Sequence, residues 1–191
     1  MEYARFTEGS NSIDYLEKAV SFIKSAENKP EDWKWVILAV QGALYGFMIC
    51  NLKGTAPDNV SKGKSQDLIS FDEALRRCQD PKQQPQKPKT AQDADWRSLG
   101  GFSTFLELSE DQRHALRRLH SEFRNQFVHY RPASWSIQLD GMSEMLMHAF
   151  DTLSAVVKMG CFYSHFESGD NDRIAALVAE GKALLRKAQE N

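Results

Sequence analysis

The run Trp35–Leu52 is the strongest constraint on the fold, because eighteen consecutive residues carry no formal charge. A membrane span needs about 20 predominantly apolar residues, so this run lies at the lower edge of that class. It also contains Gln41 and Asn51, and the chain has no second run of this kind. A helix that is apolar on all sides belongs inside a protein core. We therefore predict a buried central helix rather than a membrane span, and a soluble cytoplasmic protein.

The rest of the chain repeats apolar residues at helical spacing, and strand-like alternation is nearly absent. Ser70 and Ser109 each precede a Glu or Gln by three residues, the spacing of a capping box that begins a helix. Helices are predicted over 12–27, from Pro30 to about Lys53, over 70–78, from Ser109 to about Arg131, over 140–166 and over 170–189. The predicted fold is all-α: an antiparallel helical bundle of five or six helices, forming a single domain over residues 1–191.

Residues 80–95 contain three prolines and no large apolar residue, which predicts a long flexible insertion. Too little chain precedes this insertion to form a separate core, so we place it within the domain. Its lysines are compatible with phosphate contact, but a solvated loop is the favoured interpretation.

Composition and motif spacing exclude several function classes. The formal net charge of −2 gives no global basic field for nucleic acid, so any RNA contact needs a local patch. The cysteines, at positions 50, 78 and 161, lack C-x-x-C spacing and are interpreted as buried thiols. The chain contains no Glu-x-x-His pair, no His-x-x-x-His pair and no glycine-rich phosphate loop. We therefore expect neither a metal site nor a cofactor.

The predicted helix from Ser109 to Arg131 separates apolar from basic residues when it is drawn at about 100° per residue. On this projection Arg124 lies about 100° and His129 about 120° from the centre of the core face. The core face holds Leu116, Leu119, Phe123, Phe127 and Tyr130. One polar stripe beside it holds Arg113, Arg117, His120 and Arg124, and a second holds His114, Arg118, Ser121, Asn125 and His129.

Arg124, Asn125 and His129 form the candidate catalytic group. Cleavage of RNA without a metal requires proton transfer at the 2′-hydroxyl or the leaving oxygen, which histidine performs near neutral pH. It also requires fixed positive charge at the phosphate, which arginine supplies. Asn125 lies one turn before His129 and can orient its ring or hold a phosphate oxygen. One His and one Arg make a sparse site, so we expect a two-fold dimer that brings two copies together. A solvated basic face, or an Arg–His stack that only joins a dimer, is the alternative.

The segment Leu119–Trp135, LHSEFRNQFVHYRPASW, resembles the HEPN superfamily of small helical-bundle proteins. The signature of that family is Arg-x(4–6)-His with a polar residue, often Asn, after the Arg; Arg124, Asn125 and His129 match it. The order of the predicted helices is also similar. The resemblance implies a homodimer with a composite cleft and, in many members, metal-independent endoribonuclease activity in toxin or defence biology. Other members have lost catalysis and bind a nucleotide, RNA or a partner protein.

One departure from the family pattern bears on partners. The toxin branch that pairs with a nucleotidyltransferase antitoxin has a Tyr two residues after the His, where this chain has Arg131, with Tyr130 before it. An antitoxin-type partner is therefore not indicated by the sequence. Substrate contacts with phosphate are expected from the residues that surround the motif: Arg117, His120, Tyr130 and Arg131.

Overall fold

Helices account for nearly all the regular structure in the computed structural model, which describes residues 3–54, 56–63, 67–82, 105–129, 136–159 and 169–190. Within these ranges one isolated bridge pairs Ser61 with Leu68. The helices are α1 (Glu8–Ala26), η1 (Pro30–Asp32), α2 (Trp33–Lys53), η2 (Pro57–Val60), α3 (Phe71–Gln79), α5 (Glu110–Arg117), η3 (Arg118–Arg124), α6 (Asn125–Val128), α7 (Met142–Lys158) and α8 (Asp170–Glu190). The predicted all-α helical bundle is confirmed.

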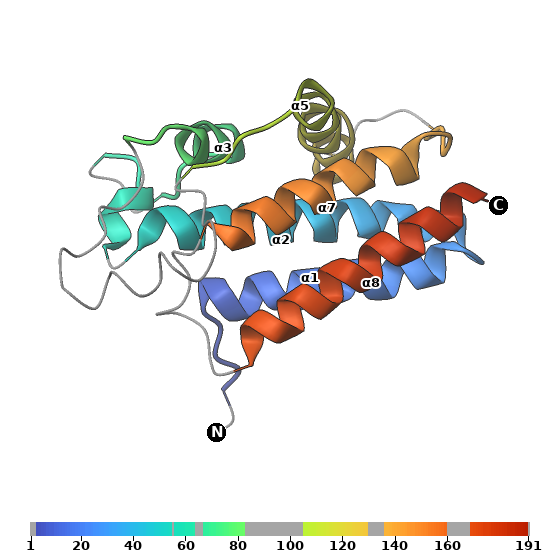
Figure 1. Cartoon of the computed structure of the whole chain (residues 1–191), viewed down its shortest axis with the longest axis horizontal. Coiled ribbons are helices and arrows are strands. Elements are labelled where there is room, and N and C mark those ends of the chain that lie inside the picture. The colour runs from blue at the N-terminus through green and yellow to red at the C-terminus, as the bar shows by residue number, and fades with distance from the viewer. Residues whose placement is uncertain are drawn as a thin grey trace.

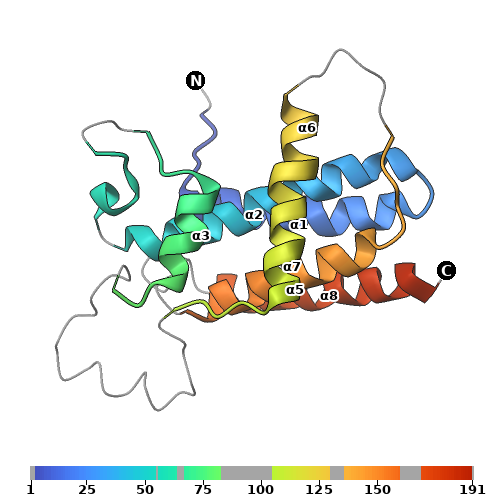
Figure 2. The same cartoon turned by 90° about the horizontal axis from the view of Figure 1, so that it is seen from above.

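Two helical hairpins lie side by side and form the body of the bundle (Figure 1). Helix α1 runs antiparallel to α2, and α7 runs antiparallel to α8, whereas α2 and α7 run in the same direction. This parallel arrangement arises because α5, η3 and α6 form one continuous helix, here called the motif helix. Figure 2 shows that helix crossing over α2 and α7, with α3 beside it. The crossing returns the chain to the end of the bundle at which α2 begins.

The uncharged helix α2 lies at the centre of the core. Phe47, Leu44 and Val40 on this helix are completely buried, and side chains from α1, α3, α7 and the motif helix surround it. By length and composition alone, Pro30–Lys53 could cross a membrane, but 72% of its most apolar window is buried inside the fold. The prediction of a buried central helix is therefore confirmed.

Helix α1 begins four residues earlier than the predicted start at Ser12. The Thr7 side chain accepts a hydrogen bond from the Ser10 N–H, and the Ser10 hydroxyl contacts the Thr7 backbone in return. The sequence rule did not find this cap because it requires a Glu or Gln at the position that Ser10 occupies. The serine hydroxyl performs the same reciprocal function with a shorter side chain.

The two predicted capping boxes have different outcomes. The Ser109 box forms in full, with hydrogen bonds in both directions. At α3, Ser70 accepts from the Glu73 N–H as expected, but the Glu73 carboxylate binds Arg76 and Arg77. These hydrogen bonds lower the pKa of Glu73 to about 2. The second half of that box is thus replaced by ion pairs within the helix.

Helix ends agree with the sequence to within a few residues. Helix α2 ends at Lys53 before Gly54, whose φ of 51° suits glycine, and the motif helix ends at Val128, three residues before the predicted end at Arg131. The described part of α7 ends at Lys158, and residues 160–166, over which the prediction continued it, lie outside the described residues. Residues 83–95 of the predicted insertion also lie outside them.

Both cysteines within the described ranges, Cys50 and Cys78, are buried, as the sequence predicted. Burial raises the pKa of Cys50 to about 12, which keeps this thiol protonated and unreactive at neutral pH. Cys161 lies outside the described residues.

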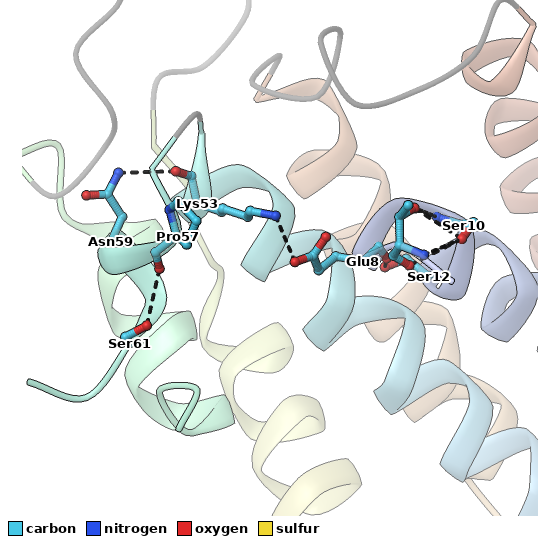
Figure 3. Close-up of polar contacts among 8 residues, drawn as sticks. Glu8, Ser10, Ser12, Lys53, Pro57, Asn59 and Ser61 are labelled. Atoms are coloured by element: carbon cyan, nitrogen blue, oxygen red, sulfur yellow. Dashed lines mark hydrogen bonds and ion pairs between the residues drawn. The ribbon is translucent and has the colours of Figure 1, made fainter. Parts of the chain in front are cut away.

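Close contact between α1 and α2 depends on two glycines on the face of α2 that meets α1. A Cβ atom at Gly42 would lie 2.8 Å from the Tyr15 ring, and one at Gly46 would lie 2.1 Å from Ser12 Oγ. The Ser12 hydroxyl donates to the Glu8 carbonyl at 2.6 Å. At the same end of the pair, Lys53 Nζ binds the Glu8 carboxylate at 2.8 Å (Figure 3).

We predict that Gly46→Ala lowers the free energy of unfolding by about 1–3 kcal/mol, because the added methyl overlaps Ser12 Oγ and the helices must separate. Urea denaturation measures the change. The Ser12→Ala background is the matched control: removing the hydroxyl leaves the nearest side-chain atom 3.1 Å from the new methyl, so part of the loss is recovered. An unchanged denaturation midpoint in Gly46→Ala would contradict this packing.

Candidate functional site

A π-helical segment, η3, interrupts the motif helix and ends at Arg124, the first residue of the Arg-x4-His element. The Asn125 N–H donates to the His120 carbonyl, five residues back, where an α-helix would use the fourth. This wider turn offsets every later side chain from the projection at 100° per residue. Leu116 and Leu119 are buried as predicted, but Phe123 is only half-buried. Phe123 and Phe127 still pack against the core, as the projection predicted, but both are only partly buried.

Arg124 closes the π segment and is held by its neighbour in sequence. Its Nη1 donates to Asn125 Oδ1 at 2.9 Å, and both side chains are half-buried. The sequence suggested that Asn125 orients the His129 ring. In the structure the Asn125 carboxamide orients the Arg124 guanidinium instead, while its backbone carbonyl accepts from the His129 N–H at 3.0 Å.

His129 lies at the exposed end of the motif helix. Its backbone is extended (φ −101°, ψ 94°), so the helix stops at the residue before it. That residue, Val128, is 42% exposed. Figure 2 shows this end of the helix, α6, projecting beyond the two hairpins. Both motif side chains thus lie outside the core of their own chain, as the sequence predicted.

His120 makes the most specific contacts of the predicted site residues. Its ring stacks on Phe71 with 4.4 Å between centroids and 14° between planes. Its Nδ1 lies 3.4 Å from Gln41 Nε2 on α2. Burial lowers the pKa of His120 below its ordinary value; the Asp72 carboxylate opposes this change and the Arg124 charge adds to it. A lowered pKa favours the neutral imidazole at neutral pH.

A groove of about 560 Å³ brings His120 and Arg124 together. The polar stripe on the sequence projection predicted that these two side chains lie on the same side of the helix. It did not predict which residues lie opposite them. The other lining residues come from the start of α1, the middle of α2 and the segment leading into α3: Glu8, Asn11, Tyr15, Gln41, Gly42, Tyr45, Gly46, Ile49, Leu68, Ile69, Ser70 and Phe71. The sequence contained a signal for one of these lining residues, because Gln41 is a polar residue within an otherwise apolar run.

The other described residues that were predicted to contact the substrate are not found in this groove. Arg117, from the same predicted stripe, is exposed on α5 before the π segment and does not line the groove. His129 does not line it either. Tyr130 and Arg131 lie outside the described residues. A single chain therefore places Arg124 with His120 and leaves His129 at the open helix end.

A second group of ionisable side chains lies on the other side of the motif helix. Asp111, His114 and Arg118 from that helix face Glu144 and His148 on α7 across a pocket of about 260 Å³. Within the described ranges, no three His, Cys, Asp or Glu side chains are grouped closely enough to hold a metal ion.

The charge environment of His120 is directly testable. We predict that NMR titration of its ring gives a pKa below the ordinary value of about 6.5. The pKa of His120 is lower in the folded chain than in the unfolded chain, so protonation favours unfolding. The stability that His120 contributes is therefore fully present above the pKa of the unfolded chain, about 6.5. It is lost as pH falls from there toward the pKa of the folded chain.

Substitutions nearby should move that pKa in opposite directions. Arg124→Met should raise it by removing a positive charge, and Asp72→Asn should lower it by removing a negative one. Arg117→Met, which removes an exposed Arg outside the groove, is the control and should leave it unchanged. If Arg117→Met and Arg124→Met change the pKa of His120 equally, the effect of Arg124 on that pKa does not depend on its position in the groove.

Comparison of the chain with protein-family models, with curated proteins and with solved structures finds no match. The resemblance to the HEPN superfamily therefore rests on the motif segment and on the order of the helices. Because fold alone does not define function, the function is argued from the chemistry of the site.

Proposed function

We propose that this chain is an RNA-directed, HEPN-type homodimer that cleaves RNA without a metal ion. One observation carries the proposal: Arg124 and His129 both lie outside the core at the free end of the motif helix, with Arg124 held by Asn125. An exposed histidine and a positioned arginine are the two groups that phosphodiester cleavage requires.

In the proposed reaction the RNA supplies its own nucleophile. The ribose 2′-oxygen attacks the adjacent phosphorus and loses its proton to a neutral imidazole, while the bond to the 5′-oxygen breaks and that oxygen gains a proton. Arg124 binds the phosphate oxygens and stabilises the extra negative charge of the transition state. One His129 serves as base and a second His129, from the partner copy, as acid.

Exposed apolar side chains near the motif support the dimer. Val128 and Leu139 are 42% and 40% exposed. Lys34 lies over the rings of both Phe127 and Trp35, at 5.9 Å and 4.7 Å from their centroids, which joins these rings into one surface. Large apolar side chains gathered at one face are typical of a protein interface. Such an interface would bring two copies of His129 together.

A catalytically inactive module that binds a nucleotide, RNA or a partner protein is the second candidate. The observation that favours it is the separation of the two motif residues, since Arg124 lines the groove and His129 does not. Binding at the groove needs no second histidine, so this candidate predicts RNA or nucleotide binding without cleavage. An antitoxin-type partner has no support from the described residues.

Cleavage of varied RNAs in the presence of EDTA tests the first candidate. We expect cleavage by the natural chain and a loss of about 10²–10⁴-fold in His129→Ala, the range attributed to general acid–base catalysis. Arg124→Met should reduce cleavage because the phosphate loses its fixed charge, and Asn125→Ala should reduce it less because the guanidinium remains.

The matched control is His114→Ala, which removes an exposed histidine on the same helix, on the side away from the groove. It should leave cleavage unchanged. Equal activity in the natural chain and His129→Ala would refute the proposed mechanism, and binding without cleavage would establish the second candidate.

The dimer makes a separate prediction. Val128→Glu or Leu139→Glu should convert the protein to a monomer in sedimentation experiments and abolish cleavage, because a charge is introduced into the apolar interface. Ala176→Glu, on the exposed side of α8, is the control and should sediment as the natural chain does. A monomeric natural chain with full activity would contradict the composite site.

A further inference from the structure

The groove that holds Arg124 is built from four parts of the chain that lie far apart in sequence: α1, α2, the segment before α3, and the motif helix. Its α2 wall includes Gly42 and Gly46, where Tyr15 and Ser12 of α1 approach the backbone closely. Tyr45 also lines the groove, and its hydroxyl donates to the Ile69 carbonyl at 2.5 Å. Its volume of about 560 Å³ lies within the range of small-molecule sites, about 300–1,000 Å³.

Gln41, on α2, places a polar side chain in the wall of the groove. It is 8% exposed, within a helix whose neighbouring side chains are apolar. Among the described residues its carboxamide has one hydrogen-bonding neighbour, His120 Nδ1, at 3.4 Å from Nε2. Gln41 Oε1 is not among the completely buried atoms that lack a partner, so it is open to the groove. A ligand in the groove can therefore donate a hydrogen bond to Gln41 Oε1 in place of water.

His120 complements Gln41. The Gln41 NH₂ group can only donate, so Nδ1 accepts and a neutral ring carries its hydrogen on Nε2. Together the two side chains offer an acceptor, Gln41 Oε1, and a donor, His120 Nε2–H. Every nucleobase edge presents donors and acceptors that can pair with such a set.

The walls and the charges of the groove also suit a nucleotide. The Tyr15 ring, packed against Gly42, remains 39% exposed, and aromatic faces of this kind stack on bases. Arg124 supplies positive charge where the groove meets the motif. Glu8 also lines the groove, and its carboxylate is paired with Lys53 (Figure 3), so the pair adds no uncompensated negative charge.

We propose that this groove binds the base of one nucleotide of an RNA strand whose adjacent phosphate lies on Arg124, with Gln41 and His120 contacting the base edge and Tyr15 stacking on it. The inference rests on the proposed function for the identity of the strand as RNA. It goes beyond that function because it assigns base recognition to residues of α1 and α2, outside the Arg-x4-His element.

Calorimetric titration with the four nucleoside 5′-monophosphates tests base binding without any cleavage, and ribose 5-phosphate serves as the base-free probe. We expect at least one monophosphate to bind roughly tenfold or more tightly than ribose 5-phosphate, the gain that stacking and one base contact provide. Gln41→Met, which keeps the side-chain length but removes the amide, should reduce that preference.

A second variant fills the groove from α1, so the binding test does not rely on a substitution within the buried helix α2. Asn11 is exposed on α1 and lines the groove, so Asn11→Trp should fill the groove and bring the affinity for the monophosphate down to that for ribose 5-phosphate. Ser21→Trp, at an exposed position of the same helix outside the groove, is the matched control and should bind as the natural chain does.

The outcomes separate this inference from the proposed function. Equal affinity for ribose 5-phosphate and all four monophosphates, or an unchanged base preference in Asn11→Trp, overturns the groove assignment even if RNA is cleaved. Base-dependent binding without RNA cleavage retains the groove and removes only the nuclease. A trinucleotide RNA that fails to compete with the monophosphate for the His129→Ala chain would show that the ligand is a free nucleotide, which contradicts the RNA strand.

Discussion

The burial of α2 is the constraint on which the rest of this structure depends. A helix without charged side chains from Trp35 to Leu52 must be covered on all sides, and α1, α3, α7 and the motif helix each contribute to that cover. Complete burial of a large side chain such as Phe47 stabilises the fold by about 1.5–3 kcal/mol, and α2 contributes many such side chains. The positions of α1 and the motif helix therefore follow from the need to cover the apolar surface of α2.

The same helix creates the groove. On the side facing α1, glycines at 42 and 46 allow Tyr15 and Ser12 to approach the α2 backbone, and Gln41 replaces an apolar residue where the motif helix crosses. Cover is incomplete at this crossing because two helices that cross at a large angle diverge on either side of their contact. The hollow that remains is lined by both polar and apolar side chains, so it suits a ligand with a polar edge and a flat apolar face.

The π segment connects the fold to the proposed chemistry. The wider turn changes the register of the side chains after Leu116 and Leu119, and Phe123 packs against the core while remaining partly exposed. Arg124 lines the groove, while His129 lies at the C-terminal end of the helix. Extra residues of this kind within helices are frequent at functional sites. Under the proposed function, a second copy is necessary because each chain supplies one His129 and the reaction uses two.

The sequence by itself determined the helical class, the central position of the apolar helix and several helix ends. It could do so because these depend on local causes: apolar period, the Ser109 cap and the glycine after Lys53. It also placed Arg124 and His129 outside the core, since one helix face can be projected from spacing alone. Tertiary structure decided the rest. The π turn, the switch of Asn125 from His129 to Arg124, and the meeting of His120 with Gln41 depend on hydrogen bonds and contacts across more than one helix. Gln41 and His120 are separated by 79 positions in the chain, and only the crossing of the motif helix over α2 brings them together.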